Sequence, residues 1–449
     1  MNNFSRIAVI SMVIVMWVAS SARADEPGLG LEQAVEIARA SDPWLDGSQY
    51  AQEALTAEAS SARTLPDPRM SVTLANMPTD TFNFGQEPMT QFAVGITQML
   101  PRGDSLKLMG QMKQQLSSQE PLLRADREGK VALTVSQLWL DAYKAQQTIA
   151  LIEQDRALFE QLVDVAMVGY SSALGKTRQK DVIRAQLELT ALEDRLAMLG
   201  QQMEANKQRL SEWVGGIAVA KPLVSQLPEL ELGMAERVTG STTLSQQEMY
   251  ELFQYHPALL ALEVQIDAAE TGSDLARQKY KPEWGVTAQY GYRDEDPMGN
   301  SRSDFLSLGV SFDLPIFTAN RQDKDVDAAV ARANQTKTQR RLLLRQLLSA
   351  FETSRSQLLR LDERQALYAT QLLPQMSEQS EASLSAYNND YGDFAEAVRA
   401  RIAELNAKIE MLSIQVERQK QIAQINYLLT DSRNTESGGD PALSGANNE

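Results

Sequence analysis

Two patterns of apolar and polar positions run along this chain, one with the period of a strand and one with the period of a helix. Four short stretches alternate apolar with polar or small residues, and they are residues 69–77, 90–100, 284–293 and 304–314. In the last of them Leu308 and Val310 would lie on one face and Gly309 on the other. Such strands are typical of a transmembrane β-barrel, although two ordinary hairpins on a soluble domain would show the same alternation.

The helical pattern follows each pair of strands and is long. Residues 103–169 and 320–386 each span 67 positions, which would reach on the order of 100 Å as continuous helices. Because proline lacks the amide hydrogen that a helix interior needs, Pro121 and Pro374 are expected to interrupt or kink these two helices.

A returning helix is predicted after each long one. In residues 178–214 and 394–430, leucine, isoleucine, methionine and valine recur at steps of three and four, which indicates coiled-coil seams. The connections, at about 170–181 and 387–394, contain glycine and read as tight tips.

The two halves of the chain repeat one unit. Gly95 and Gly309 are 214 positions apart, and so are Pro101 and Pro315. The two glycines lie within predicted strands, and each of these strands ends at a Leu-Pro step, because proline cannot donate to the ladder. The repeated unit therefore reads helix, β-hairpin, long helix, tip, returning helix.

The duplication divides the chain into five parts. They are a signal peptide at 1–24, the first repeat at 25–214, a linker rich in Gly, Pro and Ser at 215–243, the second repeat at 244–430, and a disordered tail at 431–449. The signal peptide is inferred from an apolar run after Arg6 and an A-x-A site that ends at Ala24. An N-terminal membrane anchor is the alternative for this segment, although the run is short for a membrane span.

Composition excludes several classes of function. The formal charge of -16 argues against a nucleic-acid partner, and the absence of cysteine rules out disulfides, thiolate metal sites and cysteine catalysis. No catalytic set, phosphate loop or cofactor motif appears, so we expect a protein that is not an enzyme and needs no cofactor.

The single histidine, His256, precedes Pro257 and reads as a helix start, so no metal site is assigned to it. Met77 and Met89, which flank the first loop, are the pair that merits a test as soft metal ligands, whereas others such as Met203 and Met411 lie on helices whose apolar seams would bury them.

Four strands are too few to close a barrel, since about eight are needed. An open sheet edge in lipid would leave backbone groups without partners, at several kcal/mol each. Three copies of the chain would together supply twelve strands. The sequence therefore predicts a mostly α-helical fold with a membrane β part, in which a trimeric 12-stranded β-barrel continues into a periplasmic α-helical barrel.

At this point the sequence resembles the outer-membrane efflux factors, the TolC-like family. The resemblance rests on the duplicated architecture and on the segments GITQMLPRG, YSSALGKTRQKDVIRAQ, LPDPRMSVTLANMP and LLPQMSEQSEASLSAYNNDYGDFAEAVRAR. The last two are most similar to the subgroup that works with heavy-metal pumps. The chain departs from the family in lacking a lipidated cysteine and in carrying Asp390 where the second tip often has glycine.

The resemblance implies a homotrimeric channel in the outer membrane of a Gram-negative bacterium. Its partners would be a periplasmic adaptor and an inner-membrane transporter of the resistance-nodulation-division type, and its substrates would be heavy-metal cations. A duct for drugs or for type I secretion remains an alternative, and so does a soluble periplasmic coiled-coil adaptor, which would have no lipid-facing strands.

The tips supply the candidates for an aperture or gate. They are Tyr170, Arg178 and Asp181 in the first tip, and Tyr387, Asp390, Asp393, Arg399 and Arg401 in the second. In a trimer each carboxylate would occur three times around one axis, and such a ring favours cations. Arginine–carboxylate bonds between neighbouring tips could also hold the aperture shut. The simpler reading is that these are exposed charges at helix ends.

Overall fold

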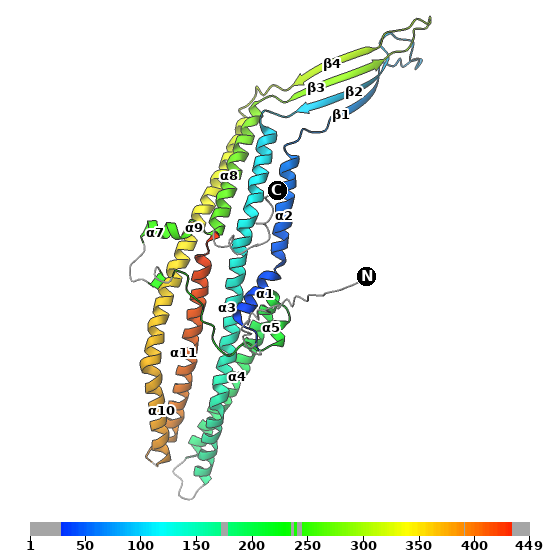
Figure 1. Cartoon of the computed structure of the whole chain (residues 1–449). Coiled ribbons are helices and arrows are strands. Elements are labelled where there is room, and N and C mark those ends of the chain that lie inside the picture. Colours follow the sequence, from blue (N-terminus) through cyan, green and yellow to red (C-terminus); the bar gives the residue numbers. More distant parts are fainter. Residues whose placement is uncertain (1–27, 172–177, 235–237, 240–244, 390, 433–449) are drawn as a thin grey trace, which may run out of the picture.

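The computed structural model describes residues 28–171, 178–234, 238–239, 245–389 and 391–432. The chain is elongated, with a β-sheet at one end and the turning points of two helical hairpins at the other (Figure 1). The predicted signal peptide, residues 172–177 of the first tip, Asp390 and nearly all of the predicted tail lie outside the described residues.

Each repeat contains the predicted order of elements. The helices are α1 (Leu31–Ala40), α2 (Pro43–Ser61), α3 (Ser105–Ser171), α4 (Gln179–Val214), α5 (Ile217–Ala220), α7 (Gln246–Phe253), α8 (Pro257–Arg277), α9 (Gln322–Leu367), α10 (Leu373–Asn388) and α11 (Phe394–Leu428). The strands are β1 (Arg69–Ala75), β2 (Gln91–Leu100), β3 (Trp284–Tyr292) and β4 (Phe305–Phe312). None of the helices in the described part of the chain is both long and apolar enough to cross a bilayer.

The four strands form one antiparallel sheet in the order β1-β2-β3-β4. The two hairpins are joined through β2 and β3, whose register runs from Phe92 opposite Tyr292 to Leu100 opposite Trp284. Strands β1 and β4 are the edges of this sheet, and each pairs with one neighbour in the described chain. Pro101 follows β2 directly and Pro315 lies shortly after β4, so the Leu-Pro steps stand where the strands end.

The sheet has one apolar face and one face of small residues, because side chains alternate along each strand. The apolar face consists of Met70, Val72, Leu74, Phe92, Val94, Ile96, Trp284, Val286, Tyr290, Tyr292, Leu306, Leu308, Val310 and Phe312. The small-residue face includes Ser71, Thr73, Ala93, Gly95, Thr97, Gly285, Thr287, Gly291, Ser307, Gly309 and Ser311. Most of the apolar face is exposed, and so large an exposed apolar surface marks a contact with a membrane or another protein.

The two long helices differ at their prolines. Helix α3 is 67 residues long and runs without a break through Pro121, so the prediction of an interruption there was wrong. In the second repeat, α9 and α10 are separated by a π turn at Tyr368–Leu372, directly before Leu373-Pro374, and the predicted interruption is confirmed. A π turn is one way in which a helix accommodates a local break in its hydrogen bonding.

The predicted seams lie in the hydrophobic core of the helical shaft. Leu192 and Leu199 of α4 and Leu405 and Leu412 of α11 are buried. The flanking seam residues Leu189, Leu196, Ile402 and Ile409 are partly buried against the same cluster. The 3–4 spacing in the sequence therefore identified the buried faces correctly.

The segment predicted as a linker packs against the shaft in its described part. The Tyr143 hydroxyl donates to the Ser225 carbonyl oxygen at 3.0 Å, and the Gly233 amide donates to Asn426 Oδ1 at 2.8 Å. Leu223 is buried in the cluster around Trp139. This segment therefore joins the two repeats and also holds α3 and α11.

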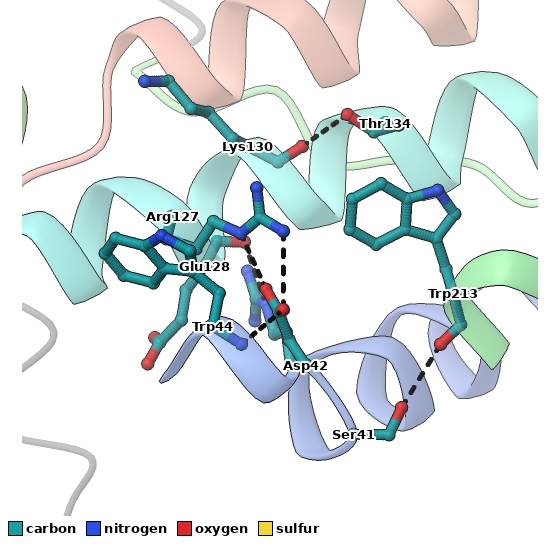
Figure 2. Close-up of polar contacts among 9 residues, drawn as sticks. Ser41, Asp42, Trp44, Arg127, Glu128, Lys130, Thr134 and Trp213 are labelled. Atoms are coloured by element: carbon teal, nitrogen blue, oxygen red, sulfur yellow. Dashed lines mark hydrogen bonds and ion pairs between the residues drawn. The ribbon is translucent and has the colours of Figure 1, made fainter. Parts of the chain in front are cut away.

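A cluster of polar and aromatic groups holds the break between α1 and α2 against α3 (Figure 2). The buried Asp42 carboxylate caps α2 by accepting from the Trp44 amide, and it pairs with Arg127 Nε at 2.7 Å. The Arg127 guanidinium lies 5.8 Å from the ring of Trp44 and 5.3 Å from that of Trp213, within range of cation–π attraction. Burial alone would raise the pKa of Asp42, but the hydrogen bonds from Arg127 and Trp44 and the Arg127 charge hold it below its ordinary value.

His256 occupies the equivalent position in the second repeat and caps α8. Its Nδ1 accepts from the Ala258 amide at 3.3 Å, so the predicted helix start is confirmed. The ring is almost fully buried and lies edge-on to Tyr427 of α11. Burial lowers the pKa of His256; Asp126 opposes this shift and Lys130 adds to it.

We predict that this histidine makes the shaft sensitive to mild acid. A buried neutral histidine stabilises the fold above its ordinary pKa of about 6.5, and stability falls below that pH by up to about 1.4 kcal/mol per unit, because the unfolded chain binds the proton more readily. Melting temperatures measured between pH 7 and 5.5 should therefore fall for the natural protein. His256→Asn, which keeps a capping side chain without a titrating group, should flatten that slope. An equal slope in both proteins would assign the sensitivity to other groups.

Candidate functional site

The first tip joins α3 to α4, and its described residues lie at the two helix ends. Tyr170 is exposed near the end of α3. Arg178 precedes α4, and its backbone amide donates to the Asp181 carboxylate at 2.9 Å. Asp181 is buried and compensates the helix N-terminus, which limits its availability to an aqueous passage.

The second tip is a tight turn between α10 and α11. The Asp393 carboxylate caps α11 by accepting from the Ala395 amide at 3.2 Å. The amide of Gly392 donates to the Ala386 carbonyl oxygen, and a Cβ atom at position 392 would lie 2.8 Å from the Tyr387 nitrogen. This close approach explains why glycine is needed here.

Aromatic packing fixes the base of the second tip. The ring of Tyr387 meets that of Phe394 at a centroid distance of 5.3 Å in an edge-to-face arrangement. Phe394 and Val398 are buried in the core between the hairpins. Tyr387 therefore holds the tip to the shaft, and Asp390 lies outside the described residues.

The two candidate arginines of α11 behave differently. Arg399 Nε donates to the Ala395 carbonyl oxygen of its own helix at 3.0 Å. Arg401 bridges two hairpins, because it pairs with Asp155 of α3 at 2.9 Å and with Glu404 of α11 at 2.8 Å. Asp155 and Glu404 are 7% and 4% exposed in their side chains, so this is a nearly buried ion pair within one chain.

Glu404 extends this network along the shaft. Its second oxygen pairs with Lys408 at 3.0 Å, and Ser380 of α10 also bonds it. Burial would raise the pKa of Glu404, yet the bonds from Lys408 and Ser380 and the charges of Arg401 and Lys408 hold it below its ordinary value. The network thus ties α3, α10 and α11 together around the Glu404 carboxylate, which its partners hold in the charged form.

The network is not saturated with hydrogen bonds. Arg401 Nε and Asp155 Oδ2 are buried without a partner in the described chain. Beside them lies a cavity of about 260 Å³ between the hairpins, lined by apolar residues of α3 and α10 such as Leu158, Leu162 and Leu384. Polar groups left unbonded in a low-dielectric setting weaken a junction, so the two hairpins meet at a place suited to separation.

Sequence reasoning found Arg401 but not its partners. Asp155 lies 246 positions away in the chain, and Glu404 and Ser380 carry no motif. Among the described candidates, Arg401 and Tyr387 come together at the cavity, whereas Arg178 and Asp181 lie at the other tip.

Comparisons with known proteins agree with this architecture. Residues 249–429 match the model of the family described as outer membrane efflux protein. The outer-membrane channel OprN superposes with a TM-score of 0.72 at 15% identity over 89% of each chain. CusC gives 0.69 at 14% identity, covering 89% of this chain and 92% of that one. VceC from Vibrio cholerae gives 0.71 at 14% identity, covering 89% and 96%.

Identities this low show a common fold. A search of curated proteins finds no match to this sequence.

We predict that Arg401→Met weakens the junction between the hairpins. Two nearly buried carboxylates would lose their common partner, at a cost of about 2 to 4 kcal/mol after allowance for the partial exposure of Arg401. The melting temperature should fall, and single-channel conductance of the reconstituted protein should rise. Arg399→Met is the matched control, because Arg399 bonds only its own helix in the described chain. Equal effects of both substitutions would show that the Asp155 link does not hold the hairpins together.

Proposed function

We propose that the chain belongs to the outer membrane efflux protein family, whose model matches residues 249–429, and that three copies form a passive exit channel that spans the outer membrane. It resides in the outer membrane of a Gram-negative bacterium, with its helical shaft extending into the periplasm. The channel would supply the passage, while an inner-membrane pump, reached through a periplasmic adaptor, would supply the energy. We assign that pump to the resistance-nodulation-division type.

The observation that carries this proposal is the open-edged sheet with one apolar face. Four strands cannot close around a pore, and unpaired edges are unfavourable in lipid. Three copies would close a ring of twelve strands, with the exposed apolar face toward lipid and the small-residue face toward the passage. This arrangement would give every strand edge a partner.

The shaft is suited to continue such a passage. Its hairpins are long, and their turning points lie at the end opposite the sheet (Figure 1). The tips would therefore form the narrow periplasmic entrance. Arg401 and its carboxylate partners would help to keep the hairpins of each chain together in the closed state.

Heavy-metal cations are the proposed substrates. The support is the second tip, where Tyr387, Gly392 and Asp393 have defined structural tasks in a segment similar to the heavy-metal subgroup. Carboxylates repeated around a three-fold axis would favour cations at this point. A channel for drugs or secreted polypeptides is the alternative within the same class.

Cell fractionation tests the outer-membrane channel against a soluble adaptor. We expect the protein in outer-membrane fractions as a detergent-resistant trimer. Cysteines placed in the loops 78–89 and 294–303 should react with impermeant reagents on intact cells. These loops touch one another at the far end of the sheet, where Arg302 donates to the Glu87 carbonyl oxygen at 3.0 Å. Release without detergent, or loop labelling only after lysis, would favour the soluble adaptor.

Metal content of cells tests the proposed substrate. Deleting the gene should raise cellular copper, silver, zinc, cobalt or cadmium severalfold during exposure to that metal. The natural chain should reverse the increase. Asp393→Asn, which keeps the cap of α11 but removes the charge, should reverse it less well. Unchanged metal content together with accumulation of hydrophobic dyes would point to the drug channel.

A further inference from the structure

The cavity between the two hairpins near the second tip has mostly apolar walls and one strongly polar side chain. Leu158 and Val165 of α3, Leu384 of α10 and Arg401 of α11 are among the residues that line it. The three apolar side chains are 38%, 47% and 38% exposed, so part of the cavity wall is accessible from solvent. A small molecule can therefore reach this cavity while the hairpins stay together. An apolar pocket with a few polar groups is the usual form of a small-molecule site.

Two buried polar atoms at this junction have no hydrogen-bond partner in the described part of the chain. Arg401 Nε is a donor without an acceptor, and Asp155 Oδ2 is an acceptor without a donor. They belong to the two sides of one ion pair, since the Arg401 guanidinium bonds the other oxygen of Asp155 at 2.9 Å. Leaving such atoms unbonded is unfavourable, so a group that accepts from one and donates to the other would be held here. A hydroxyl group does both.

The formal charges at this junction are balanced. Arg401 and Lys408 are paired with the acidic residues Asp155 and Glu404. A charged head group would bring a further charge without a counterpart into a setting where both acidic side chains are nearly buried, which is unfavourable. The junction therefore favours a neutral polar group over a carboxylate, a phosphate or an amine.

The volume of the cavity limits the body of its ligand. A dry cavity of about 150 Å³ holds one benzene molecule. The cavity between the hairpins has a volume of about 260 Å³, which leaves room for one aromatic ring with a short chain. Drug-sized molecules occupy larger pockets, of about 300 to 1,000 Å³.

We propose that this cavity binds a small neutral amphiphile, with a hydroxyl group at Arg401 and a single aromatic ring against the apolar side chains of α3 and α10. The site belongs to one chain, so it does not rest on the proposed channel. Because the ligand would contact both hairpins, its binding would favour the arrangement in which they lie together. In the proposed channel this would reduce passage at the tips.

Binding to the purified full-length protein tests the class of ligand. The probes are 2-phenylethanol, which is neutral and has one hydroxyl group, propylbenzene, which has a similar shape without the hydroxyl, and phenylacetate, which carries a negative charge. Ligand-observed NMR should show saturable binding of 2-phenylethanol, with an affinity about tenfold higher than that of either other probe. Equal affinity for propylbenzene would mark a purely apolar surface of the kind that a partner protein covers, and equal affinity for phenylacetate would mark an anion site. Either result would overturn the assigned head group. No saturable binding would leave water as the partner of the two buried atoms and would overturn the site.

Three substitutions locate the site. Leu384→Trp would fill the cavity from its exposed rim and should weaken the binding of 2-phenylethanol about tenfold or more. Leu187→Trp is the matched control, because Leu187 is an exposed leucine of α4 away from the cavity lining, and it should change the affinity by less than about twofold. Arg401→Lys keeps the positive charge but removes the Nε donor, so the preference for 2-phenylethanol over propylbenzene should disappear. Equal binding by the natural protein and Leu384→Trp would overturn the site.

Single-channel conductance tests the effect on the passage. Saturating 2-phenylethanol should lower the conductance of the reconstituted natural protein and should leave that of Leu384→Trp unchanged, which separates binding at the cavity from effects on the bilayer. Binding without a change in conductance would overturn the effect on the passage and keep the site. A protein that binds the probe but forms no channel would overturn the proposed function and keep the site.

Discussion

The whole molecule depends on burying one helix of 67 residues along its length. A helix on the order of 100 Å long cannot be stabilised by its own hydrogen bonds alone and must be covered at every level. Helices α2 and α8 cover α3 near the sheet, and α4 and α11 cover it toward the tips (Figure 1). The buried side chains of α3, among them Val135, Trp139, Ile152 and Phe159, therefore belong to two successive cores.

Both repeats cover their long helix with the same order of elements, but the residues at equivalent positions differ in chemistry. Asp42 and His256 each stand directly before a proline at the start of equivalent helices, and both cap them. Their surroundings differ, because Arg127 pairs with Asp42 and lies near two tryptophan rings, whereas the buried His256 ring lies edge-on to Tyr427. Both residues cap a helix, but their lowered pKa values have opposite effects on charge. The Asp42 carboxylate is held in its charged form, and the His256 imidazole is held in its neutral form.

The local sequence pattern was sufficient to predict the helices and strands, but it was not sufficient to predict the contacts between them. The strands, the seams and the 214-residue spacing were readable because each depends on neighbours in sequence. The link from Arg401 to Asp155 was not readable, because it depends on how α3 and α11 lie against one another. Asp181 illustrates the same limit, since a carboxylate near a tip in sequence lies buried against its own helix end. Pro121 shows it for the backbone, because the packing around α3 holds the helix continuous where propensity favoured a break.

The π turn at Tyr368–Leu372 changes the direction in which side chains point around the axis of the long helix of the second repeat. One residue added to a helical turn rotates everything beyond it by about 100° about the helix axis. Helix α9 packs against both α8 and α11, whereas α10, beyond the π turn, packs against α11. The second hairpin can in this way follow one neighbour near the sheet and another near the tip. In the first repeat the helix of equal length is unbroken, so the two repeats are alike in span and differ in the continuity of the long helix.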